Sequence, residues 1–212
     1  MTAPRLPALY AIVDPLDTGA DPLLLADAML AGGARLLQLR LKGASTRTLL
    51  DVARALRVRT HRHGALLIVN DRPDVARAAD ADGVHLGQDD LPAEAARRLL
   101  PRPALVGIST HDDCELDAAL AADPDYVAVG PIYATGSKAG ALPARGLAVV
   151  TDARRRTSCP LVAIGGITLA TAAAVRRAGA DSVAMIGALV RAPDVAAATR
   201  AALAALAAPA GD

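Results

Sequence analysis

Short apolar runs of strand length alternate with stretches of helical periodicity along the whole chain. The runs at residues 9–13 and 161–164 are almost continuously apolar, which is typical of strands buried on both faces of a parallel sheet. The expected strands are residues 9–13, 36–39, 66–69, 83–86, 105–108, 126–129, 161–164 and 182–185. The expected helices are residues 22–31, 46–61, 73–79, 92–100, 114–122, 147–156, 171–178 and 194–206. Consecutive βα units predict a parallel sheet that is covered by helices.

The number of units favours a closed sheet. Eight βα units suit an α/β fold of the single (β/α)8 TIM barrel type better than an open doubly wound sheet, which remains the alternative. The 212 residues are short for this fold but within its range, and a hydrophobic content of 53% allows a substantial core. We therefore expect one barrel domain over residues 1–212, with its chemistry at the carboxyl ends of the strands.

The composition argues against nucleic-acid and membrane partners. The net charge is +1, and the chain has no Trp, no Phe and only three Tyr, which leaves little for base stacking. Cys114 and Cys159 are far apart in sequence, as expected for simple thiols in a reducing compartment. No segment has the apolar length of a signal peptide core or a membrane span. We expect a cytoplasmic protein, and the sequence does not decide between a monomer and a homo-oligomer.

Rare polar residues mark the ends of the expected strands. The only lysines are Lys42 and Lys138, against 21 arginines, because Lys and Arg together number 23. Asn70 is the only asparagine, and Gln38 and Gln88 are the only glutamines. The lysine ammonium is a compact charge that a guanidinium does not replace. Since all five residues lie near strand ends, we expect them to share one polar site.

Gln38, Arg40 and Lys42 alternate with leucines at the end of the second strand. The two-residue period of a strand places the three polar side chains on one face. Two cations and an amide suit a polyanion such as pyrophosphate. The alternative is that the cations form ion pairs with neighbouring carboxylates.

Two aspartates follow neighbouring strands. Asp71 comes after the third strand and Asp90 after the fourth. Two carboxylates beside a phosphate-binding group are typical of a Mg²⁺ site, and no Cys/His cluster indicates a softer metal. The alternative is that both are ordinary turn or helix-start residues.

Glycines follow the last two strands, in Ile-Gly-Gly-Ile at residues 164–167 and Met-Ile-Gly-Ala at residues 185–188. The loops after strands seven and eight of a barrel commonly bind phosphate through backbone N–H groups. We therefore expect a phosphate site there.

The loop after the sixth strand is long and can act as a lid. Thr135, Ser137 and Lys138 could close over a phosphate with hydroxyl and ammonium donors. Among the histidines, His111 at the rim after the fifth strand has a position suited to catalysis, whereas His85 is expected to pack inside the barrel.

Together these motifs resemble the thiamine phosphate synthase family of (β/α)8 enzymes, from about Leu9 to about Pro193. The combination of His-Leu-Gly-Gln-x-Asp at residues 85–90 with Val-Asn-Asp at residues 69–71 is highly specific. The other matching motifs are Leu-Tyr-Ala-Ile-Val-Asp at 9–14, Gln-Leu-Arg-x-Lys at 38–42, Gly-Ile-Ser at 107–109, Gly-Pro-Ile-Tyr at 130–133, Ile-Gly-Gly-Ile at 164–167 and Met-Ile at 185–186.

The resemblance implies a transferase that joins 4-amino-2-methyl-5-hydroxymethylpyrimidine diphosphate to a thiazole phosphate, giving thiamine phosphate and pyrophosphate. In this chemistry the pyrophosphate leaves first, assisted by one Mg²⁺ per subunit, and the thiazole nitrogen captures the resulting cation. The roles carried over are Asp71 and Asp90 for Mg²⁺; Arg40, Lys42, Asn70 and Lys138 for pyrophosphate; Gln38 and Ser109 for the pyrimidine; and Thr135, Ser137, Gly166, Ile186 and Gly187 for the thiazole phosphate. Of these, Arg40, Lys42, Lys138 and Ser109 are the expected catalytic residues.

Three positions depart from the family pattern. Leu41 stands where the family commonly has Glu, Ser137 where it favours Thr, and Gly187 where it often has Ser. None of these changes removes a metal ligand or a pyrophosphate cation.

Two other functions remain as alternatives. A thiazole tautomerase of the same superfamily would transfer a proton, for which His111 could serve, without a metal or pyrophosphate. A non-catalytic barrel that binds thiamine precursors would need neither. Asp71 and Asp90 favour the synthase, because the tautomerase lacks the paired aspartates.

Overall fold

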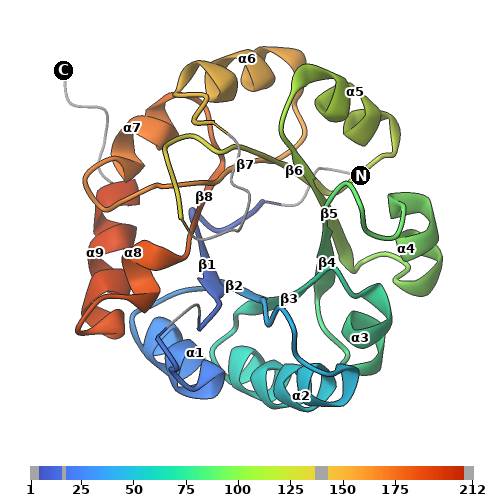
Figure 1. The fold of residues 1–212 in the computed structure, drawn as a ribbon, viewed down its shortest axis with the longest axis vertical. Helices are drawn as coiled ribbons and strands as arrows, with labels where there is room; N and C mark the ends of the chain where they lie inside the picture. Colours follow the sequence, from blue (N-terminus) through green and yellow to red (C-terminus); the bar gives the residue numbers. More distant parts are fainter. Residues whose placement is uncertain (1–4, 16–17, 137–142, 208–212) are drawn as a thin grey trace.

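The strands of the protein close into a parallel barrel, in a computed structural model that describes residues 5–15, 18–136 and 143–207. Each strand pairs with the next along the chain and β8 pairs with β1, so the barrel is closed in sequence order (Figure 1). The strands are β1 (Leu9–Val13), β2 (Leu36–Leu39), β3 (Leu66–Asn70), β4 (Gly83–Leu86), β5 (Leu105–Thr110), β6 (Tyr126–Val129), β7 (Leu161–Ala163) and β8 (Ser182–Met185). The expected (β/α)8 barrel is confirmed.

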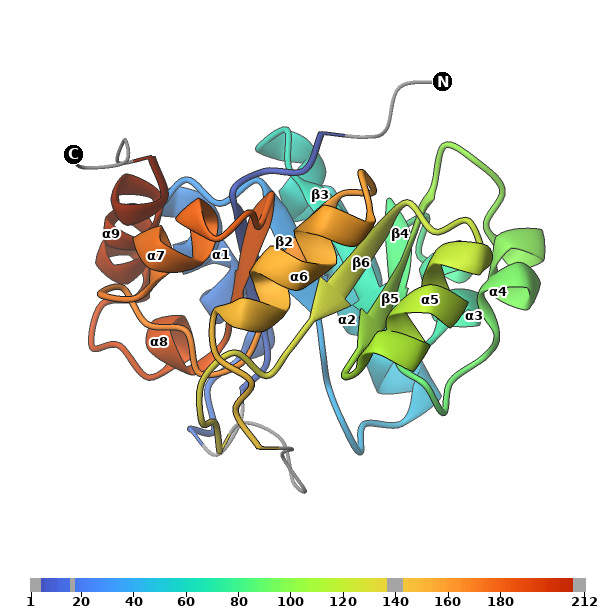
Figure 2. The same ribbon diagram turned by 90° about the horizontal axis from the view of Figure 1, so that it is seen from above.

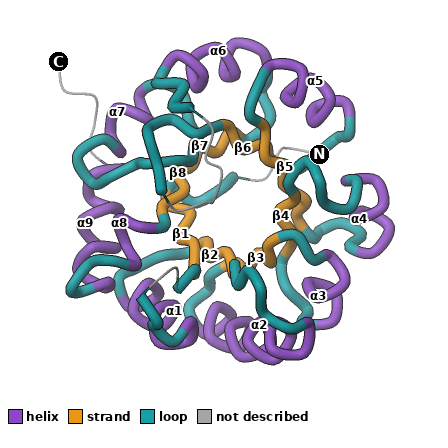
Figure 3. Tube along the Cα trace, in the orientation of Figure 1, coloured by secondary structure: helices purple, strands orange, loops and turns teal. Residues whose placement is uncertain are grey.

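The helices form a ring outside the strands (Figure 3). They are α1 (Pro22–Ala31), α2 (Thr46–Arg62), α3 (Pro73–Ala78), α4 (Ala93–Leu99), α5 (Asp113–Ala121), α6 (Ala148–Arg156), α7 (Ala172–Arg177), α8 (Gly187–Val190) and α9 (Val195–Ala207). Among the described residues, no helix has both the length and the hydrophobicity needed to cross a membrane.

Side chains cap the first two helices. The Asp21 side chain accepts a hydrogen bond from the Leu23 N–H at 2.7 Å, with Pro22 in the first turn of α1. The Ser45 side chain caps α2 in the same way, accepting from the Thr48 N–H at 3.1 Å.

Most element bounds agree with the sequence-based expectation to within two residues. The short helix α8 was not expected, because a single helical turn shows no hydrophobic periodicity. β5 also extends two residues beyond the expected strand, so Ser109 and Thr110 belong to the strand itself.

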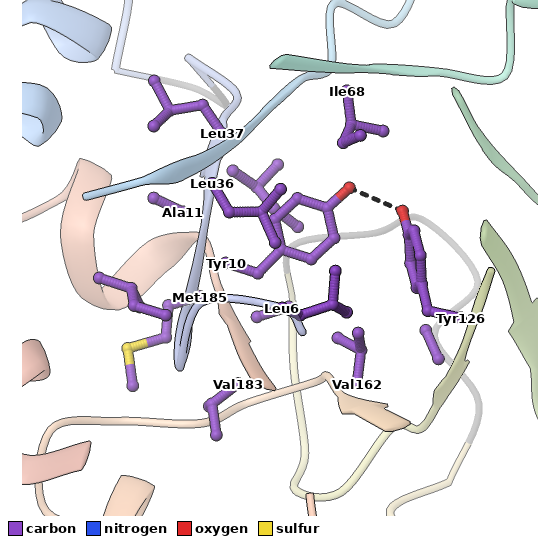
Figure 4. Packing of buried hydrophobic residues seen from close by; sticks show 14 of the residues in the cluster. Leu6, Tyr10, Ala11, Leu36, Leu37, Ile68, Tyr126, Val162, Val183 and Met185 are labelled. Carbon is purple, nitrogen blue, oxygen red and sulfur yellow. Dashed lines mark hydrogen bonds between the residues drawn. The ribbon is translucent and has the colours of Figure 1, made fainter. Parts of the chain in front are cut away.

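Parallel pairing brings the carboxyl ends of all strands to one end of the barrel. Seen from the side, the loops after β2, β6 and β8 emerge together at that end, opposite to the segment that leads into β1 (Figure 2). The interior is filled by buried side chains from all strands, and Leu6 in the segment before β1 packs beside Tyr10 and Tyr126 (Figure 4).

Candidate active site

A large cavity opens at the carboxyl ends of β1 to β5, with a volume of about 1650 Å³. It gathers eight of the residues that the sequence predicts for the site: Gln38, Arg40, Lys42, Asn70, Asp71, Asp90, Ser109 and Ile186. Gln88, the remaining rare amide, also lines this cavity and donates from Nε2 to the Ser109 carbonyl oxygen at 2.6 Å. The polar residues at these strand ends therefore share one cavity.

The two predicted metal ligands lie beside each other. Asp71 has a φ of 64°, in the left-handed region, and its N–H donates to the His85 carbonyl oxygen at 2.8 Å across β3 and β4. The Asp90 carboxylate accepts from the Gly87 N–H at 2.7 Å. Burial raises the pKa of Asp90; the Gly87 N–H opposes the shift, and the neighbouring Asp71 carboxylate adds to it.

This pair of carboxylates fits a magnesium ion. Two negative groups in contact repel each other, and a hard divalent cation between them would remove the repulsion. In the described residues no group of three or more His, Cys, Asp or Glu side chains forms a metal centre. A site of two carboxylates is the kind that Mg²⁺ completes with substrate oxygens and water.

The two cations of β2 and its following loop differ in their surroundings. Arg40 forms an ion pair with Asp14, and the side chains are 12% and 8% exposed. Lys42 pairs with Asp71, and its side chain is 59% exposed. Ion pairing with nearby carboxylates, the alternative raised from the sequence, is thus what the structure shows, although both cations also line the cavity.

A second cavity of about 340 Å³ lies at the ends of β5 to β8. It is lined by Thr135, Gly166, Ile186 and Gly187, all predicted for the thiazole phosphate, and by Arg191. Ser109, His111, Ile164 and Ile186 line both cavities, so the two spaces meet.

Gly166 is required by its geometry. Its φ is 63°, and a Cβ there would lie 2.4 Å from the Ala134 carbonyl oxygen in the loop after β6. The close approach of these two loops, and not only the exposure of N–H groups to an anion, therefore explains this glycine.

Two predicted residues, Ser137 and Lys138, lie outside the described residues. Three groups that line or support the cavities were not predicted from the sequence: Asp14, Arg191 and Glu115, which lies 2.8 Å from His111 Nδ1. A carboxylate directly after β1 is a sequence signal for Asp14, but its pairing with Arg40 is a tertiary contact.

Comparison with known proteins agrees with this geometry. Residues 9–189 match the model of the family described as thiamine monophosphate synthase. The chain belongs to the thiamine monophosphate synthase family. A thiamine-phosphate synthase of Methanospirillum hungatei is 46% identical over 91% of this chain and 94% of its own length. That of Chloroflexus aurantiacus is 48% identical over 91% of this chain and 89% of its own.

A solved structure of the thiamine monophosphate synthase family superposes closely. The thiamine phosphate pyrophosphorylase from Pyrococcus furiosus has a TM-score of 0.85 and 32% identity, over 94% of this chain and 95% of its own. The family match over residues 9–189 spans every strand of the barrel.

Proposed function

We propose that this chain is a thiamine-phosphate synthase, which joins 4-amino-2-methyl-5-hydroxymethylpyrimidine diphosphate to thiazole phosphate. The observation that carries the proposal is the meeting of two unlike cavities. One holds paired carboxylates and cations, and the other is lined by glycine-rich loop ends. Two phosphorylated substrates could therefore bind with their reacting ends at the shared wall.

The larger cavity suits the diphosphate. Asp71 and Asp90 would hold Mg²⁺, which supplies positive charge that stabilises the leaving pyrophosphate. Arg40 and Lys42 would add fixed positive charge, and Asn70 a hydrogen-bonding amide. As the carbon–oxygen bond to the diphosphate breaks, the electron pair leaves with pyrophosphate, and the thiazole nitrogen supplies the pair for the new carbon–nitrogen bond. Such a reaction needs no protein nucleophile.

The smaller cavity suits the thiazole phosphate. Gly166 and Gly187 lie where backbone N–H groups approach an anion in barrels of this type. Arg191 is the one Arg or Lys side chain among the described residues that line this cavity. Lys138, which we place over the departing pyrophosphate, and Ser137, which we place at the thiazole phosphate, stay predictions from the sequence.

A second candidate, thiazole tautomerase, has one observation in its favour. His111 lines both cavities, and its Nδ1 lies 2.8 Å from Glu115 Oε2, an arrangement that can orient a proton-transfer group. Against it stand Asp71 and Asp90, because isomerisation needs neither carboxylate nor metal.

Pyrophosphate release separates the candidates. The purified protein is mixed with both substrates, with each one alone, and with or without Mg²⁺. The synthase releases pyrophosphate only with both substrates and Mg²⁺. A tautomerase isomerises the thiazole alone, and a non-catalytic barrel does neither; either result contradicts the proposal. The proposal also includes one barrel domain, a cytoplasmic location and small molecules as the only substrates.

A further inference from the structure

A chain of hydrogen-bonded side chains crosses the inside of the barrel. Gln38 Nε2 on β2 donates to the Tyr10 hydroxyl on β1 at 2.8 Å. The Tyr10 and Tyr126 hydroxyls point toward each other at 2.9 Å (Figure 4). His85 on β4 continues the chain, with Nδ1 3.1 Å from the Tyr126 hydroxyl and Nε2 2.8 Å from the Ser109 hydroxyl. Gln38 and Ser109, which both line the larger cavity, are thus joined through Tyr10, Tyr126 and His85, and of these three His85 also lines that cavity.

Packing holds the middle of this network in place. The Tyr126 ring stacks on His85, with centroids 5.6 Å apart and an interplanar angle of 12°, and meets Tyr10 edge-on. A Cβ at Gly107 would lie 2.0 Å from Tyr126 Cζ, so the ring occupies space that only glycine leaves on β5. Barrel interiors are usually filled by apolar side chains, and buried polar groups are costly unless each is satisfied. A hydrogen-bonded polar chain is therefore unusual at this position, which indicates a role in the site.

The donor at the Gln38 end of the network decides the direction of the other hydrogen bonds. Burial, as the largest cause, raises the pKa of Tyr10 and of Tyr126, so both phenols keep their single hydrogen. Because Gln38 donates to Tyr10, the Tyr10 hydrogen goes to Tyr126, and that of Tyr126 goes to His85 Nδ1. His85 then carries its hydrogen on Nε2 and donates to Ser109. At the two ends, the Gln38 Oε1 acceptor and the Ser109 O–H donor have no further partner among the described residues, and a ligand can meet them there.

We infer that Tyr10, Tyr126 and His85 are positioning residues that fix Gln38 as an acceptor and Ser109 as a donor toward the cavity, and so select an aminopyrimidine over its oxo analogue. This inference rests on the proposed function. A 4-aminopyrimidine has an N–H donor beside a ring-nitrogen acceptor, which complements the pair. A 4-oxopyrimidine has the reverse order, a carbonyl acceptor beside a ring N–H, and would meet an acceptor with an acceptor.

Tyr126→Phe tests the inference, because it removes one hydroxyl and keeps the ring. The Tyr10 hydrogen loses its acceptor and can turn to Gln38 Oε1 once that amide rotates, which ends the selection. We expect the wild type to bind the 4-amino diphosphate at least about tenfold better than the 4-oxo diphosphate, about 1.4 kcal/mol. In the variant the preference should fall below about threefold, while the Kd of inorganic pyrophosphate with Mg²⁺ stays within about twofold.

Three further measurements make the test decisive. Thr199→Val, which also removes a buried hydroxyl but on α9, should keep the full preference. Tyr10→Phe should repeat the loss if Tyr126→Phe does not fold. The ¹⁵N shifts of the His85 ring should show hydrogen on Nε2 in the wild type and a mixture of tautomers in Tyr126→Phe.

The outcomes separate this inference from the proposed function. The positioning role alone is overturned if Tyr126→Phe keeps the preference for the 4-amino diphosphate. It is also overturned if the variant binds both pyrimidine diphosphates and pyrophosphate more weakly by the same factor. A wild type that binds neither pyrimidine diphosphate overturns the proposed function and this inference with it.

Discussion

Substitutions of Arg40 and Lys42 should both lower activity but should differ in their effect on folding stability, because the two ion pairs differ in burial. Arg40 pairs with Asp14 where both side chains are largely buried, at 12% and 8% exposure. Removing one partner of such a pair leaves a buried charge and costs about 3 kcal/mol. For a chain of this length, Arg40→Gln should lower the Tm by about 6–12 °C.

Lys42 should behave differently. Its side chain is 59% exposed, and an exposed pair contributes at most about 0.5 kcal/mol, so Lys42→Gln should leave the Tm within about 2 °C. Both variants should lose at least about tenfold in kcat/KM, about 1.4 kcal/mol of transition-state stabilisation, since each removes a charge from the proposed pyrophosphate site. Thermal unfolding and pyrophosphate release measure the two effects.

The double variant Asp14→Asn/Arg40→Gln decides whether Arg40 acts on the substrate. Removing both charges should recover most of the stability, because neither charge of the buried pair remains. The activity should stay low. If the double variant recovers activity together with stability, Arg40 serves only to pair with Asp14, and the reasoning about the leaving group is wrong.

Asp71→Asn and Asp90→Asn should each remove most activity and weaken the Mg²⁺ dependence while the fold is kept; near-normal turnover with an unchanged Mg²⁺ response excludes the metal site. The pKa of the Asp90 carboxyl group is raised, so the folded state binds a proton at this group more tightly than the unfolded state does. The contribution of Asp90 to folding stability is therefore present at low pH and is lost as the pH rises through the raised pKa. Asp90→Asn should therefore unfold at a higher temperature than the wild type at neutral pH without Mg²⁺, and a lower Tm would contradict the burial of this charge. Lys138→Arg should lower kcat/KM at least about tenfold, whereas Arg54→Lys on the exposed face of α2 should leave kcat/KM unchanged. If the two variants have the same kcat/KM, Lys138 is a surface charge. Gly166→Ala should raise the KM for thiazole phosphate more than the KM for the diphosphate, because Gly166 has a φ of 63° and a Cβ there would lie 2.4 Å from a backbone oxygen. If both KM values change equally, the substitution disturbs the whole fold and not the smaller cavity alone.

The sequence predicted the strands well because each is a short apolar run between turn residues. β4 and β6 agree with the expectation at both ends, since glycine or polar residues bound them on each side. α8 could not be predicted, because one turn of helix is set by the loop that precedes it and not by a periodic pattern.

The placement of Asp71 and Asp90 in one cavity was predictable, because each follows the end of a strand. Contacts between distant strands were not predictable. Tyr10 and Tyr126 are separated by 116 positions, and nothing in their local sequence indicates that their hydroxyls meet inside the barrel. The pairing of Arg40 with Asp14 was open in the sequence for the same reason, since it depends on β1 and β2 lying side by side.

The stoichiometry of the reaction tests the central claim most directly. Thiamine phosphate and pyrophosphate are quantified over time from the purified protein with both substrates, in Mg²⁺ and again after chelation. The proposed synthase forms the two products in equal amounts, and chelation stops both. Thiamine phosphate formed at an undiminished rate after chelation would contradict the metal site, and absence of thiamine phosphate in Mg²⁺ would contradict the proposed function.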